Sequence, residues 1–464
     1  MSTPIGDAPF PPPQAGSPLP PSPGGVPLPP PPGDGSFPPL APTGAVPSPW
    51  ISARGREIVE RVRELAPLIR AQAAEGERIA DLTPEVLTAL HDAGIYRMTK
   101  PVEWGGDGLG ARDVVEVVSA LGAADGSAGW AAFVSVGLKN LLALDPQVVE
   151  EVRADTVDWV GPAVVGASVF ATRVGSATKV DGGWKVSGQW AFGSGCTHAR
   201  WALVGIEWDP EIGGGTGRGV AVLTRDQFEV VDDWDVMGLS GTASNSIRSV
   251  GEVFVPEHRA IDLVEYPARL GRLHEDYSGL GYKQRGTALL IAVSLADVAV
   301  ALGMARGALS AFAEQAVRRK PFTLPYPTIA DMPSAQVAAG KALAMTNSAA
   351  AIIESIADQV DARTAAGLDF AHDEESEIAL GLSYAANVCE DAINLLQKTI
   401  GSSTVARSNP IQRFVRDVRV LTSHGAIRLD PQAEVNGRRL LGLAPFAMFG
   451  GAVPERRADK VGAA

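Results

Sequence analysis

Four long apolar segments in the last third of the chain constrain its fold most. Ala, Leu, Ile and Val recur in them at steps of three and four residues, which places apolar side chains along one face of an α-helix. Helices of this length bury such faces against one another, so we expect a four-helix bundle within residues 266–443. The segments are Thr287–Val317, Ser334–Ala366, Glu375–Ile400 and Gln412–Ser423.

The chain before this bundle changes its hydrophobic period. Residues 50–160 have helical spacing, and Thr83-Pro84-Glu85 has the N-cap, first-turn proline and first-turn acid of a helix start. Residues 161–265 alternate with a period of two and are rich in β-branched residues, with Asp181-Gly182-Gly183 at the tip of a hairpin. We therefore predict an α+β, mostly α, fold in which a small β-sandwich or barrel domain separates an N-terminal helical domain from the bundle.

The two ends of the chain differ in composition from these domains. Residues 1–49 hold 19 of the 35 prolines, and such a segment can neither bury a core nor donate many backbone hydrogen bonds. We predict a disordered, proline-rich tail that serves as a solubilising extension, or else docks on a proline-binding partner. Residues 444–464 are predicted to be a C-terminal tail.

Charge and cysteine content exclude several classes of protein. The net charge of -13 repels phosphate backbones, so we expect no nucleic-acid partner. Cys196 and Cys389 lie far apart, and no Cys/His spacing resembles a metal site, which indicates a reducing, cytoplasmic setting and no metal. No uninterrupted apolar run reaches the ~18 residues of a membrane helix, so we expect no membrane.

Two short motifs in the β region combine aromatic rings, small residues and hydroxyls. They are Trp190–Ala199 and Met237–Ser244. A planar isoalloxazine ring needs flat apolar walls, close backbone approach and a few polar contacts, so the two motifs together suggest a flavin site. Each motif alone is better explained by a core strand followed by a Gly/Ser turn. No Gly-x-Gly-x-x-Gly follows a strand, so no nicotinamide site is expected.

The order of domains and motifs resembles the acyl-CoA dehydrogenase superfamily over residues 51–443. Pro101–Gly110 is similar to the Pro-x-x-x-Gly-Gly-x-Gly loop of that superfamily. The Trp-x-Phe-x-Ser-Gly form at Trp190–Gly195, and Ser408–Asp417 with Ser423-His424 after it, resemble the oxygenase components of two-component flavin-dependent monooxygenases.

This resemblance implies an activity. A separate NAD(P)H-dependent flavin reductase would supply reduced FMN or FAD, which reacts with O2 to a C4a-(hydro)peroxyflavin that hydroxylates or oxygenates a small aromatic or heteroatom-containing substrate. By the same resemblance, Ser194 supplies a hydroxyl near flavin N5, Trp190 and Phe192 wall the ring, and Thr242 and Ser244 contact the flavin or its ribityl chain. Whether the flavin is FMN or FAD stays open.

His424 is the candidate acid/base residue. It resembles the histidine that this branch carries after its Arg-Asp pair, and imidazole titrates near neutrality. The alternative is a helix-end histidine that bonds to a backbone carbonyl. Asp430 either orients His424 or begins an Asp-Pro turn, and the turn is favoured. Arg413 and Asp417 lie four residues apart, so on a helix they share a face and are expected to pair.

Two further segments resemble positions at which the superfamily contacts a neighbouring subunit's flavin. They contain Arg318 and Arg319, whose cations suit a flavin phosphate, and Gly401 and Ser402. The resemblance therefore implies a homo-oligomer, with a tetramer as the expected form.

The sequence departs from this branch at two places, one of which is the loop Gly238–Gly241, where it has serine and arginine is frequent. Many of its hydroxylases carry a second histidine where Val136–Asn140 has none, which puts phenol hydroxylation in doubt. Two alternatives to a monooxygenase remain. An acyl-CoA dehydrogenase or oxidase would need a bundle carboxylate as base, and no motif marks one. A non-catalytic scaffold of the same fold would bind no flavin.

Overall fold

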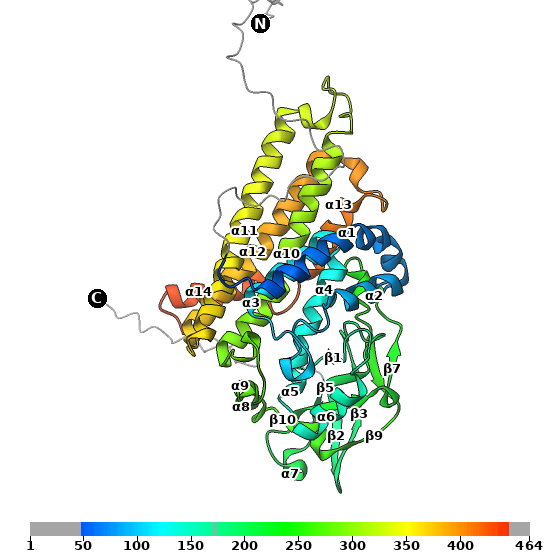
Figure 1. Cartoon of the computed structure of the whole chain (residues 1–464), viewed down its shortest axis with the longest axis vertical. Helices are drawn as coiled ribbons and strands as arrows, with labels where there is room; N and C mark the ends of the chain where they lie inside the picture. Colours follow the sequence, from blue (N-terminus) through cyan, green and yellow to red (C-terminus); the bar gives the residue numbers. More distant parts are fainter. Residues whose placement is uncertain (1–47, 170, 172–173, 445–464) are drawn as a thin grey trace, which may run out of the picture. The chain divides into compact units, whose positions relative to one another are not determined.

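The computed structural model describes residues 48–169, 171 and 174–444. Its first part is helical (Figure 1), and Thr83 accepts a hydrogen bond from the Val86 amide at the start of its second helix, as its N-cap role predicts. The helices are α1 (Ala53–Ile79), α2 (Pro84–Ala93), α3 (Ala111–Ala124), α4 (Gly126–Val134), α5 (Leu138–Leu142) and α6 (Pro146–Asp155).

A β region follows and forms two sheets. The seven-stranded sheet has the order β10-β6-β5-β2-β3-β9, with β1 paired to β5, and the three-stranded sheet has the order β4-β8-β7. The predicted hairpin is β2–β3, in which Val180 lies opposite Gly183 across a two-residue turn. The elements are β1 (Val164–Ala167), β2 (Gly175–Val180), β3 (Gly183–Ser187), β4 (Gln189–Trp190), β5 (Trp201–Glu207), α7 (Pro210–Gly213), β6 (Arg218–Thr224), β7 (Phe228–Val231), β8 (Ser246–Ser249), β9 (Val253–Pro256) and β10 (Ala260–Asp262).

The last part of the chain is helical again. Helices α10 to α13 pack on one another as the four-helix bundle that the periodicity predicts, and this confirms the predicted fold class. These helices are α8 (Tyr266–Leu270), α9 (Leu273–Asp276), α10 (Gly286–Ala316), α11 (Pro333–Ala365), α12 (His372–Ile400), α13 (Pro410–Thr422) and α14 (Leu429–Leu440).

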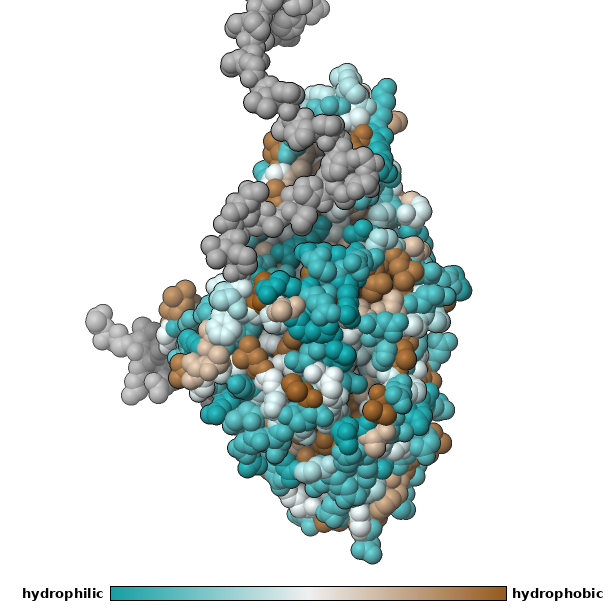
Figure 2. All heavy atoms as spheres, in the orientation of Figure 1, coloured by the Kyte–Doolittle hydropathy of each residue, from teal (hydrophilic) through white to brown (hydrophobic). Residues whose placement is uncertain are grey.

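Helix α10 is the central helix of the bundle. It packs on α3, α4, α11, α12 and α13. By length and composition Gly286–Ala316 would also suffice to cross a membrane, contrary to the expectation that no segment would, but 83% of its most apolar window is buried inside the protein. Its apolarity is therefore explained by its place in the core. On the face shown in Figure 2, exposed hydrophobic residues are dispersed among hydrophilic ones.

Helices α3, α4 and α10 approach one another through glycine. A Cβ atom added to Gly303 of α10 would lie 2.8 Å from the Cα of Gly122 in α3. One added to Gly129 of α4 would lie 3.0 Å from that same atom. No side chain separates the three backbones at this point, so α4 is held directly against the other two helices.

The predicted proline-rich tail and C-terminal tail lie almost entirely outside the described residues.

Candidate active site

The two hydroxyl-bearing motifs of the β region meet in space. The backbone amide of Gly195 donates to the carbonyl of Thr242 over 2.9 Å, which joins the loop after β4 to the 3-10 turn Ser240–Thr242. Leu239 and Ala243 flank this turn and both have positive φ, 52° and 47°, so the turn is sharply bent. The bend brings the side chains of Thr242 and Ser244 toward Ser194.

A chain of hydrogen bonds runs through these side chains. The indole Nε1 of Trp130 donates to Ser194 Oγ over 3.0 Å. Ser194 Oγ lies 2.7 Å from Ser244 Oγ, and Ser244 Oγ lies 2.7 Å from Thr242 Oγ1. Thr242 Oγ1 donates to the carbonyl of Leu239 over 2.8 Å. Ser244 and Thr242 are buried, whereas Ser194 is half-buried and remains accessible to a ligand.

The two aromatic residues of the first motif lie in different environments. Phe192 has a positive φ of 60° and a 69% exposed side chain, which contacts Trp234 edge-to-face. Trp190 is fully buried in the core of the β region, where its Nε1 donates to the Gly205 carbonyl over 2.7 Å. A fully buried ring offers no surface to a ligand, so the predicted ring contact of Trp190 is wrong, while that of Phe192 stays a prediction.

His424 follows the end of α13 and pairs with a carboxylate of α10. Its Nδ1 lies 3.2 Å from Oδ2 of Asp297, which is 2% exposed, and the imidazole itself is 45% exposed. The hydrogen bond to Asp297 raises the pKa of His424 above its usual value of 6.5. Asp430, the partner considered from the sequence, lies instead in the first turn of α14. A carboxylate that fixes one ring nitrogen leaves Nε2 for acid/base work.

Trp130 joins His424 to the hydroxyl chain and was not predicted as a site residue. Its ring lies edge-on to the His424 imidazole, with centroids 5.6 Å apart, while its indole nitrogen bonds to Ser194. The ring of Phe133, one turn further along α4, lies 4.7 Å from that of Trp130. The two catalytic candidates, Ser194 and His424, therefore both contact the indole ring of Trp130.

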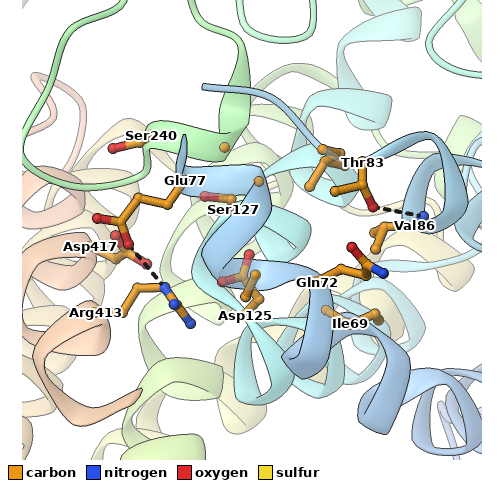
Figure 3. A pocket seen from close by; sticks show the side chains of 14 residues that line it. Ile69, Gln72, Glu77, Thr83, Val86, Asp125, Ser127, Ser240, Arg413 and Asp417 are labelled. Atoms are coloured by element: carbon orange, nitrogen blue, oxygen red, sulfur yellow. Dashed lines mark hydrogen bonds and ion pairs between the residues drawn. The ribbon is translucent and has the colours of Figure 1, made fainter. Parts of the chain in front are cut away.

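A buried pair of carboxyl groups lies where the segments of the site meet. Asp125 accepts from the Ala128 amide and caps α4, and Oδ1 of Asp417 accepts from the Leu239 amide over 2.7 Å. Both side chains line a small pocket beside α1, with Glu77 and Arg413 in the same pocket (Figure 3). Burial raises the pKa of both carboxyls, and the nearby charge of Asp125 raises that of Asp417 further.

The expected pairing of Arg413 with Asp417 is wrong. Arg413 Nε lies 3.3 Å from Glu77 Oε2, and Arg416 bonds to the same carboxylate over 2.8 Å. Oδ2 of Asp417 is buried and has no hydrogen-bond partner among the described residues. A buried oxygen without a partner is better tolerated on a neutral carboxylic acid than on a carboxylate, in agreement with the raised pKa of Asp417.

The segment that lacks the second histidine supplies a buried amine. Nζ of Lys139 donates to the Gly281 carbonyl over 2.7 Å and to Gln284 Oε1 over 2.8 Å, and burial lowers its pKa to about 8. Leu138 is 7% exposed within an apolar cluster. This segment therefore supplies a buried amine, which holds the loop before α10, in place of a histidine.

The remaining predicted residues gather at the other end of the bundle. Arg318 and Arg319 follow α10, Gly401 and Ser402 follow α12, and the Arg319 guanidinium donates to Ser403 Oγ. Ala316 lies nineteen positions after Asp297 along α10, a distance of about 28 Å at 1.5 Å per residue. Within one chain these residues therefore do not share a site with Ser194 and His424.

The residues around Ser194 suit a flavin. They offer the half-buried hydroxyl of Ser194 and the exposed ring of Phe192. Gly193 and Gly195 have no side chain beyond Cα, so a flat ring can come close to the main chain there. A small, mainly apolar hollow adjoins Gly195 and Thr242 and is lined by Tyr96, Ala131, Val134 and His198, among others. Among the described residues no group of His, Cys, Asp and Glu is arranged to hold a metal ion.

Comparisons with known proteins agree with this arrangement. Residues 52–145 match the family model for the N-terminal domain of acyl-CoA dehydrogenases, and residues 295–429 match the model for their C-terminal domain. A pigment production hydroxylase from a Rhodococcus species is 30% identical over 395 residues, which cover 83% of this chain and 97% of that one. The oxygenase component of an FADH2-dependent resorcinol hydroxylase from a Rhizobium species is 29% identical over 402 residues, 84% and 96% of the two chains.

Solved structures extend the similarity to three dimensions. The HsaA monooxygenase of Mycobacterium tuberculosis superimposes with a TM-score of 0.74 at 26% identity, over 85% of this chain and 99% of that one. XiaF from a Streptomyces species, solved with FADH2, has the same fold with a TM-score of 0.77 at 22% identity, over 85% and 97% of the chains. The chain belongs to the acyl-CoA dehydrogenase superfamily, in its branch of flavin-dependent monooxygenase oxygenase components.

Proposed function

We propose that the chain takes reduced FMN or FAD from a separate NAD(P)H-dependent reductase and uses O2 to insert one oxygen atom into a small aromatic or heteroatom-containing substrate. The observation that carries this proposal is the contact of one indole ring, that of Trp130, with both Ser194 and His424. Relatives named as resorcinol hydroxylase and p-hydroxyphenylacetate 3-hydroxylase support an aromatic substrate.

The bound flavin would supply the oxidising chemistry, and the protein's own residues would control protons and water around it. Ser194 holds the proton at flavin N5 through its hydroxyl. Phe192 covers the ring plane, and the buried side chains of Thr242 and Ser244 fix Ser194 in place.

His424 acts as the acid/base residue. Asp297 holds Nδ1, so Nε2 is the nitrogen that exchanges a proton with the substrate or with the oxygen being transferred. Because its pKa is raised, His424 carries a proton over a larger part of the neutral range than a free imidazole does. It can therefore donate a proton at the start of the oxygen transfer and recover one from the product.

The segment Val136–Asn140 supplies no histidine, and its Val136 and Leu138 are apolar and buried. His424 is the polar contact that we propose for the substrate, while the hollow beside Gly195 adds apolar side chains together with His198, which bonds to Asp81. This favours an aromatic or heteroaromatic compound with one polar group, such as an indole.

The active form is a homo-oligomer, with a tetramer expected from the family. Arg318, Arg319, Gly401 and Ser402 are too far from Ser194 in the same chain, and they would contact a neighbouring subunit's flavin through its phosphate or ribityl groups. Cys196 and Cys389 are both free and buried, which fits a cytoplasmic location.

The test mixes the purified protein with chemically reduced FMN or FAD, admits O2, and measures oxygenated product and hydrogen peroxide with a panel of phenols, indoles, thioethers and amines. With at least one compound of the panel we expect oxygenated product to appear and the amount of hydrogen peroxide released to fall. A parallel incubation with acyl-CoA and a dye acceptor should leave the dye unreduced. Dye reduction with acyl-CoA, and no oxygenated product from any compound, would refute the proposal in favour of a dehydrogenase.

A further inference from the structure

The hydroxyl chain beside Trp130 has only one possible arrangement of hydrogens. Three oxygen–oxygen contacts of 2.7–2.8 Å link Ser194 to Ser244, Ser244 to Thr242, and Thr242 to the Leu239 carbonyl. Each contact needs a hydrogen, because two oxygen atoms this close otherwise repel one another. Three hydroxyl groups supply three hydrogens, so none is left over.

The direction of donation along these hydrogen bonds follows from the last acceptor, the Leu239 carbonyl. A carbonyl oxygen only accepts, so Thr242 donates to Leu239. Ser244 must then donate to Thr242, and Ser194 must donate to Ser244. At the other end, Trp130 Nε1 carries a hydrogen and donates to Ser194.

Ser194 consequently has no hydrogen to offer a ligand. Its hydroxyl hydrogen points to Ser244, one lone pair accepts from Trp130, and the second lone pair is free. The partners that fix this state are buried, since Ser244 and Thr242 are 4% and 5% exposed, while Ser194 itself is accessible. The protein therefore presents a hydroxyl that accepts and does not donate.

We infer that this fixed acceptor makes the site select reduced flavin over oxidised flavin. The inference rests on the proposed function, in which Ser194 lies at flavin N5. In reduced flavin N5 carries a hydrogen that Ser194 can accept, whereas in oxidised flavin N5 is a bare lone pair that would face the lone pair of Ser194. An oxygenase that receives its flavin in the reduced form and releases it oxidised gains turnover from this preference.

The experiment compares the Kd of reduced FMN, measured without oxygen, with the Kd of oxidised FMN. We expect the wild-type protein to bind reduced FMN about tenfold more tightly, the factor that corresponds to about 1.4 kcal/mol. Thr242→Val and Ser244→Ala each release a hydrogen along the chain, which lets Ser194 donate to oxidised N5. Both variants should lower the ratio of the two Kd values at least about threefold, mainly by tighter binding of oxidised FMN.

Two further variants separate this role from a general loss of packing. Trp130→Phe removes a donor but leaves Ser194 pointing to Ser244, so the Kd ratio should stay as in the wild type even if both affinities fall. Ser240→Ala removes a hydroxyl of the same turn that bonds only to Val236, and should change neither Kd. The smaller truncation Ser244→Ala answers the question if Thr242→Val does not fold.

The outcomes distinguish this inference from the proposed function. A wild-type protein that binds both forms of FMN equally, or variants at Thr242 and Ser244 that keep the wild-type ratio, would overturn the inference and leave the monooxygenase proposal intact. A wild-type protein that binds no reduced flavin at all would overturn both.

Discussion

His424 Nδ1 lies 3.2 Å from Oδ2 of Asp297, although 127 positions separate the two residues in the chain. The carboxylate is almost completely buried in α10, while the imidazole at the end of α13 is accessible. A buried partner on a rigid helix fixes the ring that would exchange protons with substrate. The pair gives His424 both its orientation and its raised pKa.

Replacing Asp297 with Asn should lower the pKa of His424. Asn keeps an oxygen that accepts from Nδ1–H but removes the negative charge that favours the imidazolium form. The part of the pH–rate profile that depends on the protonation of His424 should therefore move to lower pH. NMR titration of the imidazole measures the change in its pKa directly. Asp430→Asn is the matched control and should leave the limb in place. An unchanged profile in the Asp297 variant would show that His424 is not the titrating group.

Replacing His424 with Ala should separate oxygen consumption from product formation. General acid–base catalysis typically contributes about 10²- to 10⁴-fold, so product formation should fall by a factor in that range. Flavin binding should change little, because Ser194, Ser244 and Thr242 remain. The measurement is the ratio of oxygenated product to hydrogen peroxide per flavin oxidised. Retention of the wild-type ratio would contradict the role assigned to His424.

Replacing Asp417 with Asn should flatten the pH dependence of stability. Because the pKa of this carboxyl is raised in the folded protein, the folded state keeps a proton that the unfolded chain loses above about pH 4. The free energy of unfolding therefore falls as the pH rises from about 4 through the pKa of the folded state. Asn mimics the protonated carboxyl and still accepts from the Leu239 amide. The variant should therefore lack this decrease in the free energy of unfolding, which is on the order of 1–3 kcal/mol. Urea unfolding at several pH values tests this, with the exposed Asp232→Asn as control. If the free energy of unfolding of the variant changed with pH as steeply as that of the wild type, the raised pKa assigned to Asp417 would be contradicted.

Trp190 and Phe192 should respond to substitution in opposite ways. Trp190→Phe removes a buried hydrogen bond to Gly205 and some packing, and should destabilise the protein by about 1–3 kcal/mol with flavin affinity within about twofold of the wild type. Phe192→Ala removes an exposed ring and should weaken flavin binding without changing stability. Thermal unfolding and flavin titration of both variants decide the matter. Loss of flavin affinity on Trp190→Phe alone would restore that residue to the site.

The fold was accessible to sequence reasoning because its elements have strong local signals. The start of α10 was predicted at Thr287 and lies at Gly286, and that of α11 was predicted at Ser334 and lies at Pro333. Apolar residues at helical spacing carry this information within each segment. The Asp181-Gly182 turn was equally clear, because a two-residue hairpin needs the positive φ that Gly182 supplies.

The partners within the site were less accessible, because long-range contacts leave no local signal. Asp297 is the one charged residue between Gly286 and Ala305 of α10, and this isolation was the only sign of a special role. Arg413 pairs with Glu77, 336 residues away, rather than with Asp417 one turn along its own helix. Trp190 was expected to wall the flavin ring, yet glycine at 175 and 188 leaves room for its ring inside the β region.

The glycine contacts among α3, α4 and α10 have a consequence for how new substrates arise in this lineage. Gly129 directly precedes Trp130, and Gly303 lies on the same helix as Asp297, so main-chain contact sets the spacing between the indole and the acid/base pair. Where helices touch through their main chains, there are no side chains whose substitution could bring the helices closer together. Changes in specificity are therefore expected to come from side chains such as Ala131 and Val134, which line the hollow beside Gly195, while main-chain contact keeps the spacing of the three helices.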